Sequence, residues 1–230
     1  VPPVKRPPVN QPGTLASRFR RRRFALLREI LAPLLAEGGR VRILDVGGRR
    51  DYWELLEPDL AGRLSIVILN NETVELETGA RPEDGLEVEY ALGDACDMPQ
   101  YADGAFDLAH ANSVIEHVGG LGAMARMADE VRRVGRAYFV QTPHLWFPVE
   151  PHYGVPFFHW LPAPTRARLG WRYKIGWRKQ ADDYREAIML ADHTQLVDVT
   201  LMRELFPDGE LVRERLAGLT KSLIARRPAA

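Results

Sequence analysis

Between residues 41 and 143 the sequence alternates short apolar runs with segments of helical character. Five segments predict strands: VRILDV (41–46), RLSIVILNN (63–71), LEVEYALGDA (86–95), AFDLAHAN (105–112) and RAYFVQTP (136–143). The first is a short apolar run rich in β-branched residues, which predicts a buried strand, whereas the third alternates and ends in Gly-Asp. Helices are predicted over 51–60 and 121–135. Strands that alternate with helices form a parallel sheet covered by helices, so the pattern predicts an α/β protein.

The flanking segments complete this architecture. Apolar residues at helical spacing predict a helix over 14–39, which a Gly-Gly pair ends. Near the C-terminus a helix is predicted over 198–207, followed by strands over 209–218 and 219–227. Two strands joined so closely must run antiparallel. We therefore expect a doubly wound, mostly parallel seven-stranded sheet with helices on both faces and an antiparallel last strand.

Composition limits the classes of function. The chain has 230 residues, 46% of them hydrophobic, which is enough for one sizeable core. Its 31 basic and 31 acidic side chains balance, which argues against binding to nucleic acid. Its one cysteine, Cys96, excludes an internal disulfide and a thiolate zinc cluster. No apolar stretch reaches the length of a membrane span, and we expect a cytoplasmic protein.

The domain organisation follows from the same patterns. Residues 1–13 are proline-rich and predict a flexible tail. Residues 14–230 are predicted to form a single domain, with 144–195 as an inserted region that covers a substrate. The oligomeric state stays open.

The ends of the predicted strands carry the residues that suit a ligand. In an open parallel sheet, ligands bind at the carboxyl ends of the strands. Small, acidic or amide residues follow the first four strands: Asp45, Gly47 and Gly48; Asn70, Asn71 and Glu72; Gly93, Asp94 and Ala95; Asn112 and Ser113. Carboxylates and amides accept hydrogen bonds from ribose hydroxyls, and glycines let a ligand approach the backbone. This set predicts a ligand with a diol, a purine edge and a zwitterionic tail.

Three stretches in order, ILDVGG, GDACDMP and DGAFDLAHANSVIEHV, resemble the class I (Rossmann-like) S-adenosylmethionine-dependent methyltransferases, in their type-11 or type-23-like small-molecule branch. The resemblance covers roughly residues 38–143. It implies that Asp45 and Gly47 shape the pocket for the methionine part of the donor. It also implies that the end of the second strand holds the ribose and that Asn112 flanks the sulfonium. The adenine amine would be held by Asp94 and the backbone of Ala95. The cofactor-binding residues expected are Asp45, Gly47, Gly48, Arg49, Asn70, Asn71, Asp94, Ala95 and Asn112.

The sequence departs from the family pattern at two places. Arg49 stands where the family has a further glycine. Its side chain could pair with the carboxylate of the donor, or Arg49 and Arg50 could simply point to water. The family has an acid at the tip of the second strand, where this chain has asparagine, so either Asn70 or Glu72 holds the ribose.

The stretch HLWFPVEPHYGVPFFHW (144–160) is the most unusual part of the chain, because it combines histidines with many aromatic residues. It could form a substrate-binding lid, a structural plug over the sheet, or a metal site built from its histidines and Glu150. We expect the lid, with His152 or Tyr153 facing the methyl group of the donor.

Other polar residues allow two interpretations each. His117 could take a proton from an attacking hydroxyl or serve a structural role, whereas His110 is predicted to be a hydrogen-bonded core residue. The basic run RFRRRR (18–23) could bind phosphate or an acidic substrate, or form a solvated helix face. The predicted catalytic residues are His117, His152 and Tyr153.

The function predicted is in-line transfer of a methyl group from S-adenosylmethionine to a small-molecule acceptor, at a hydroxyl. The sulfonium already activates the methyl, so we expect neither a metal nor a covalent intermediate. A nicotinamide-dependent oxidoreductase is an alternative, but the full G-x-G-x-x-G pattern is absent after residue 45. The other alternative is a degenerate fold that acts as a non-catalytic binding or scaffolding subunit.

Overall fold

The computed structural model describes residues 15–53, 56, 58–71, 85–149 and 151–229. The tail predicted over 1–13 lies outside these residues, as do Glu72 and Glu150.

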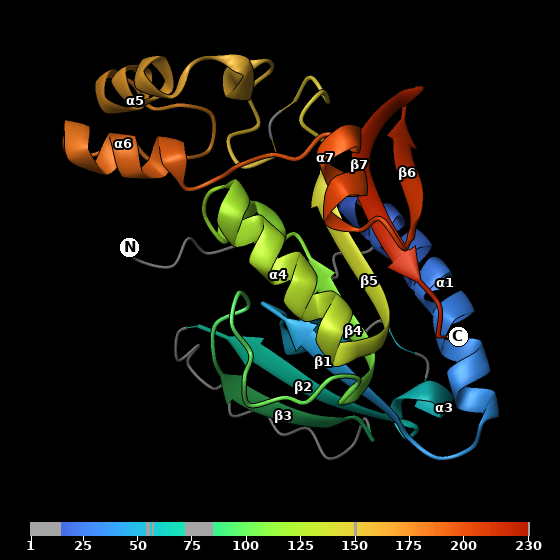
Figure 1. The fold of residues 1–230 in the computed structure, drawn as a ribbon. Coiled ribbons are helices and arrows are strands. Elements are labelled where there is room, and N and C mark those ends of the chain that lie inside the picture. Colours follow the sequence, from blue (N-terminus) through green and yellow to red (C-terminus); the bar gives the residue numbers. More distant parts are fainter. Residues whose placement is uncertain (1–14, 54–55, 57, 72–84, 150, 230) are drawn as a thin grey trace. The chain divides into compact units, whose positions relative to one another are not determined.

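Seven strands form one sheet in the order β3-β2-β1-β4-β5-β7-β6, seen in Figure 1. The strands are β1 Val41–Val46, β2 Leu64–Asn70, β3 Glu87–Leu92, β4 Phe106–Asn112, β5 Gly135–Pro143, β6 Glu210–Leu216 and β7 Leu219–Arg227. β1 pairs in parallel with β2 and with β4, and β2 pairs in parallel with β3. The sheet is mostly parallel with an antiparallel β7, which confirms the predicted fold class.

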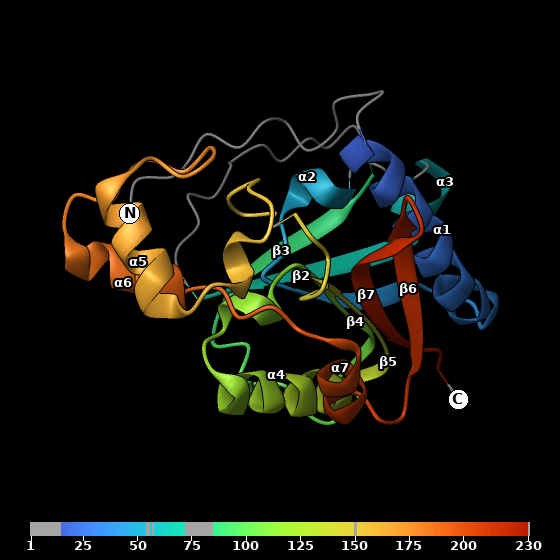
Figure 2. The same ribbon diagram turned by 90° about the horizontal axis from the view of Figure 1, so that it is seen from above.

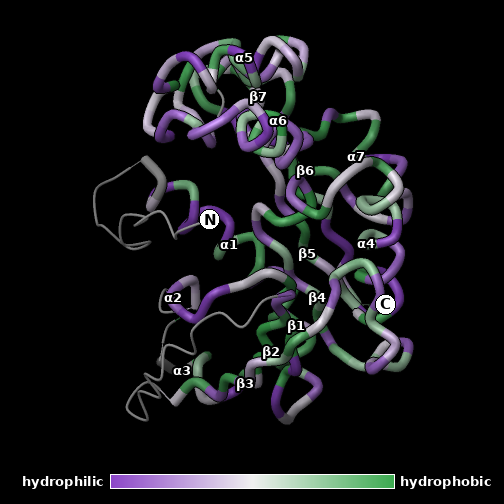
Figure 3. Tube along the Cα trace, turned by 90° about the vertical axis from the view of Figure 1, so that its left-hand side faces the viewer, coloured by the Kyte–Doolittle hydropathy of each residue, from purple (hydrophilic) through white to green (hydrophobic). Residues whose placement is uncertain are grey.

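The chain divides into two compact units, which are described one at a time. The first unit comprises residues 1–112, 129–140 and 226–230, as far as they are described. Its core is formed by β1 and β2, where Ile43, Leu44 and Ile66 have no exposed surface. In Figure 3 much of both strands is green, the hydrophobic end of the colour scale. This burial explains why these strands appear in the sequence as continuous apolar runs.

Helices of the first unit cover this core. α1 (Leu15–Ala36) contacts β1 and buries Leu27 and Leu31. The sequence predicts a single helix over 51–60. This prediction is wrong, because the structure has two short helices instead, α2 (Arg50–Trp53) and α3 (Pro58–Ala61). Pro58 begins α3, a position where proline is favoured because the first N–H of a helix needs no partner.

The second unit comprises residues 113–128 and 141–225. It holds the 3₁₀ turns η2 (Ile115–His117) and η3 (Phe158–Trp160), the strands β6 and most of β7, and three helices: α5 (Ala163–Arg172), α6 (Tyr184–Asp192) and α7 (Val199–Leu205). α4 (Leu121–Val134) and β5 have residues in both units. Among the described residues, no helix combines the length and apolar character that crossing a bilayer requires.

Two helices of the second unit, α5 and α6, are absent from the sequence prediction. They lie side by side in Figures 1 and 2 and contact each other over their length. The core beside them consists mainly of small side chains: Ala167 of α5, Ala187 and Ala191 of α6, and Ala181 of the segment between them, with Leu190 packed against this cluster. Alanine gives a weak hydropathy signal, so the apolar stripe of these helices is hard to recognise in the sequence.

One buried histidine ties β5 to β7 within the second unit. His144 follows β5, is 8% exposed, and has its Nδ1 3.2 Å from the carbonyl oxygen of Thr220. Because a carbonyl oxygen only accepts, Nδ1 is the donor. Burial lowers the pKa of His144, and the bond to Thr220 opposes this only in part.

Because the pKa of His144 is lower in the folded chain, His144 binds a proton more tightly when the chain is unfolded. We therefore expect the free energy of unfolding to fall as the pH drops from about 7 to about 5, through the ordinary histidine pKa. Urea titrations across this range measure the slope, and His144→Gln should make it shallower. An equal slope in His144→Gln and the wild type would contradict this assignment.

Candidate functional site

The turn after β1 is shaped by two glycines. Gly47 has φ +64°, a backbone conformation that suits glycine, and its N–H donates to the carbonyl of Leu69 at 2.7 Å. A Cβ on Gly48 would lie 1.8 Å from the carboxylate of Asp45. Only glycine therefore fits at position 48 while Asp45 keeps its place. The turn leaves the backbone open to the close approach that the sequence predicts for a ligand.

Asp45 is buried and fully occupied by neighbouring donors. Its side chain is 1% exposed and accepts hydrogen bonds from His110 Nδ1 at 2.6 Å and from Trp53 Nε1 at 2.7 Å. His110 Nε2 in turn lies 3.3 Å from the hydroxyl of Tyr52. His110 is therefore the hydrogen-bonded core residue that the sequence predicts. The carboxylate of Asp45 holds β4 and α2 next to the turn. It therefore supports the wall of the expected donor pocket from its buried side.

The tips of β2 and β3 carry polar groups at the same edge of the sheet. Asn70 Nδ2 donates to the carbonyl of Gly48 at 3.3 Å, which ties the end of β2 to the turn. Asn71 is exposed and follows directly. After β3, one carboxylate oxygen of Asp94 accepts from the N–H of Cys96 at 2.8 Å, and Ala95 is half-buried between them. Asp94 itself is exposed and so accessible to a ligand.

Two arginines lie at this edge of the sheet, and each has a neighbouring partner. Arg49 forms an ion pair with Asp51 at 3.2 Å and its side chain is 47% exposed, so its guanidinium already has a partner. Arg23 of α1 is 7% exposed, and its Nη1 donates to Oδ1 of Asn112 at 2.9 Å. Sequence analysis assigned Arg23 only to a basic run. The signal that could have found it is its place in the apolar stripe, four residues after Phe19 and four before Leu27.

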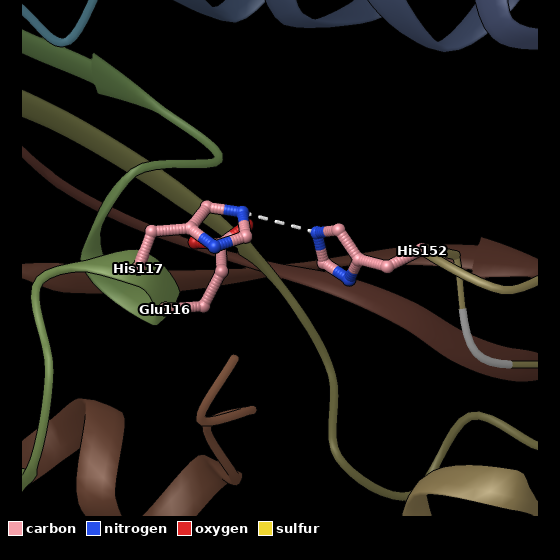
Figure 4. A group of neighbouring side chains, drawn as sticks. All are labelled: Glu116, His117 and His152. Carbon is pink, nitrogen blue, oxygen red and sulfur yellow. Dashed lines mark hydrogen bonds between the residues drawn. The ribbon is translucent and has the colours of Figure 1, made fainter. Parts of the chain in front are cut away.

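In the second unit, two of the predicted catalytic residues meet. His117 belongs to η2 and His152 to the segment 144–160, and their Nε2 atoms lie 3.1 Å apart, as Figure 4 shows. Glu116 is completely buried beside them, and the ligand atoms of the three side chains all lie within 4.8 Å of one another. In the sequence Glu116 follows the fourth strand and is a possible bonding partner of His117, but it is not among the predicted catalytic residues.

Several contacts hold this cluster of Glu116, His117 and His152 in place. The hydroxyl of Thr142 donates to Oε2 of Glu116 at 3.0 Å, and the N–H of Gln195 donates to its carbonyl at 2.8 Å. Trp177 Nε1 donates to the carbonyl of His152 at 2.8 Å. These bonds fix both chain segments that carry the histidines.

A third histidine lies against the pair. The ring centroid of His193 is 5.0 Å from that of His117, with the planes tilted by 31°. Burial lowers the pKa of His193 most, and the charges of Arg178 and His152 lower it further. A neutral imidazole is therefore favoured next to His117.

Tyr153, the third predicted catalytic residue, makes the contacts of a packing residue. It is 8% exposed, and its hydroxyl donates to the carbonyl of Leu190 at 3.4 Å. Its ring packs on Phe158 with a centroid separation of 4.7 Å. Its catalytic role stays a prediction.

The metal site considered for Glu150 lies outside the described residues, but Glu116 offers a buried carboxylate to the histidines instead.

The two units offer different chemistry. The edge of the first unit has a glycine turn and polar tips on consecutive parallel strands, which is how α/β proteins bind nucleotide-like cofactors. The cluster of the second unit can exchange a proton or hold a cation. A fold and site of this kind are typical of α/β domains that bind nucleotide-like cofactors.

Residues 44–138 match the family described as "Methyltransferase domain". Over this region the chain is similar to the class I S-adenosylmethionine-dependent methyltransferases that the sequence analysis names. A search of curated proteins gave no match.

Solved structures share the fold at low identity. The PH0226 protein from Pyrococcus horikoshii OT3 is 15% identical, with a TM-score of 0.54, over 98% of this chain and 97% of that one. The N-terminal domain of EvdMO1 with S-adenosylhomocysteine bound is 15% identical, with a TM-score of 0.53, over 95% and 86%. Phosphoethanolamine N-methyltransferase 2 from Haemonchus contortus, in complex with S-adenosylmethionine, is 15% identical, with a TM-score of 0.51, over 84% of this chain and 38% of that one.

The hydrogen bond from Trp53 to Asp45 generates a stability prediction. Trp53→Phe keeps an aromatic ring but removes a donor from a buried carboxylate, so we expect the free energy of unfolding to fall by about 1–3 kcal/mol. Urea unfolding measures it. Trp146→Phe is the matched control, because Trp146 is 59% exposed. Equal effects of the two substitutions would contradict the importance of the bond.

Proposed function

We propose that the protein transfers the methyl group of S-adenosylmethionine to a hydroxyl of a small-molecule acceptor, with the His117–His152 pair as proton acceptor. The observation that carries this proposal is the 3.1 Å contact between the two Nε2 atoms beside a buried carboxylate. A hydroxyl is a weak nucleophile until its proton leaves, so a positioned base increases the rate of attack.

The donor is assigned to the carboxyl ends of β1 to β4. Gly47 and Gly48 would lie along its methionine part, and Asn70 and Asn71 would accept from the ribose. Asp94 and the backbone of Ala95 would bind the adenine amine. This assignment extends the family resemblance to named positions, and the accessible carboxylate of Asp94 supports it. For Glu72, the alternative ribose ligand, the described residues give no geometry.

The proposed reaction is a single displacement. The acceptor oxygen attacks the methyl carbon in line with the carbon–sulfur bond, whose electron pair passes to sulfur. S-adenosylhomocysteine leaves, and the hydroxyl proton goes to an imidazole Nε2 of the pair. A carboxylate near the ring, here Glu116, stabilises the imidazolium that results. The chemistry needs no Lewis acid, because the sulfonium is already the activating group.

The histidine pair contains the group that such a base requires. Where two imidazoles join through their Nε2 atoms, one donates and the other accepts, so one nitrogen lone pair takes part in the bond. If the hydroxyl of the acceptor takes the place of the donating ring, the lone pair of the other ring already points toward it. His193, held neutral by burial, adds no positive charge that would oppose protonation of His117.

The acceptor class to test first is a small molecule with several hydroxyls. The aromatic side chains of 144–160, among them Trp146 and Trp160 with ring centroids 6.0 Å apart, supply apolar surface suited to such a ligand. The similar EvdMO1 domain was crystallised in the presence of S-adenosylhomocysteine and D-fucose. The Haemonchus contortus enzyme is named for an amine acceptor, so amines are the competing class.

The donor assignment is tested by calorimetric titration with S-adenosylhomocysteine. Asp94→Ala should weaken binding by about 1–3 kcal/mol, because the adenine amine would lose its charged acceptor. Asp97→Ala is the control, since Asp97 is also exposed and lies three residues further on. Unchanged affinity in Asp94→Ala would remove Asp94 from the site, and no binding by the wild type would refute the donor site as a whole.

The proton acceptor is tested by His117→Ala and His152→Ala with the best acceptor from a panel of hydroxyl and amine compounds. Each substitution should lower kcat roughly 100-fold or more, with donor affinity nearly intact. His159→Ala is the control, because His159 lies in the same segment but bonds to the carbonyl of Leu145.

Two outcomes would count against this role. If donor affinity or folding fails together with turnover in His152→Ala, the segment is a structural plug. If wild-type turnover disappears after treatment with a chelator and returns with a divalent metal, the cluster is a metal site rather than a base.

A further inference from the structure

The histidine pair of the second unit has the spacing of two ligands on one metal ion. The Nε2 atoms of His117 and His152 lie 3.1 Å apart, and the two rings are nearly perpendicular at 87°, as Figure 4 shows. Zinc binds imidazole nitrogens at about 2.0–2.1 Å, so two such nitrogens on a tetrahedral ion lie about 3.3 Å apart. A small rotation of the two rings is therefore enough to direct both nitrogens to one ion.

Glu116 adds a carboxylate to this pair. Its side chain is completely buried, and the ligand atoms of Glu116, His117 and His152 all lie within 4.8 Å of one another. The carboxylate offsets part of the charge of a divalent ion, which two neutral imidazoles cannot do. At this range it binds an ion directly or through one water molecule. Two histidines and one glutamate are a common ligand set for zinc.

Neighbouring groups orient these ligands before an ion arrives. The hydroxyl of Thr142 donates to Oε2 of Glu116 at 3.0 Å, which fixes the plane of the carboxylate. Trp177 Nε1 donates to the carbonyl of His152 at 2.8 Å, which holds the backbone of the second histidine. Contacts of this outer kind tune the affinity of metal sites.

The chemistry of the ligands selects the ion. Imidazole nitrogens favour Zn²⁺, Ni²⁺ and Cu²⁺, whereas Mg²⁺ and Ca²⁺ favour sites built from oxygen ligands. With two nitrogens and one carboxylate, the cluster suits a transition-metal ion.

We propose that Glu116, His117 and His152 bind a divalent transition-metal ion, Zn²⁺ first, and that the bound ion inhibits methyl transfer. The inhibition rests on the proposed function, in which an Nε2 lone pair of the histidine pair takes the proton of the acceptor. An ion that holds both Nε2 lone pairs leaves neither for that proton. Turnover and bound metal therefore exclude each other.

This role is opposite in sign to that of a catalytic metal. A chelator that removes a catalytic ion abolishes turnover. A chelator that removes an inhibitory ion restores the proton acceptor, so turnover rises or stays the same.

Metal binding is tested by calorimetric titration of the full chain, without an affinity tag and without donor, with Zn²⁺ and with Mg²⁺. Only Zn²⁺ should bind. Loss of an outer contact already costs about 10–100-fold in metal affinity, so His117→Ala and His152→Ala should each weaken Zn²⁺ binding about 100-fold or more, and Glu116→Gln about tenfold. His159→Ala is the matched control, because His159 bonds to the carbonyl of Leu145.

A second measurement needs no variant and so does not depend on how well a substituted chain folds. Co²⁺ added to the wild type should give the intense visible absorption of a tetrahedral ion, whereas Co²⁺ in water is octahedral and pale. Zn²⁺ should also raise the temperature of thermal unfolding, because it binds the folded chain. The inference is overturned if the wild type binds no Zn²⁺ and shows no such Co²⁺ absorption. It is also overturned if His117→Ala and His152→Ala both bind Zn²⁺ like the wild type.

Inhibition is tested with any acceptor that the wild type methylates. Zn²⁺ should lower turnover over the concentration range in which it binds, and a chelator should restore it, while Mg²⁺ has no effect. Zn²⁺ that binds at these residues without slowing turnover would overturn the inhibition and the role of the pair as base, but not the metal site. Absence of any turnover would refute the proposed function, and the titrations without donor would still decide the metal site.

Discussion

The buried carboxylate of Asp45 is the group on which the ligand edge of the first unit depends. At 1% exposure it needs charge-compensating donors, and it has two, from His110 on β4 and from Trp53 on α2. These bonds fix the strand beside β1 and the helix after the turn at one point. The same carboxylate forces position 48 to be glycine, because a Cβ would overlap it. The absence of a side chain at position 48 is thus a consequence of the buried carboxylate of Asp45.

Charge at this edge is arranged by α1 rather than by the turn itself. The turn supplies Arg49 and Asp51, which neutralise each other. α1 adds Arg23, held by Asn112, and Arg20, whose Nη1 is buried. These two side chains bring a helix outside the matched region 44–138 to the same edge of the sheet.

The second unit shows how an irregular segment can hold reactive groups rigidly. His152 lies in a stretch with little regular structure, yet its carbonyl accepts from Trp177 and its ring meets His117. Gly176 is needed close by, since a Cβ there would lie 1.8 Å from the carbonyl oxygen of Tyr153. Glu116 is bonded through both its side chain and its backbone. The position of the proposed base is therefore set by hydrogen bonds rather than by a helix or strand.

The sequence by itself determined most of the sheet, because strands that are buried on both faces, such as β1 and β2, appear as apolar runs with a polar end. It placed β1 at its observed bounds, recognised the antiparallel final pair, and assigned His110 to the core. It could not find α5 and α6, beside which the core consists mainly of alanines, or see that Arg23 is buried among apolar residues of α1. Nor could it pair His117 with His152, which are 35 residues apart. That contact joins segments whose spacing along the chain carries no information about distance, so only tertiary packing decided it.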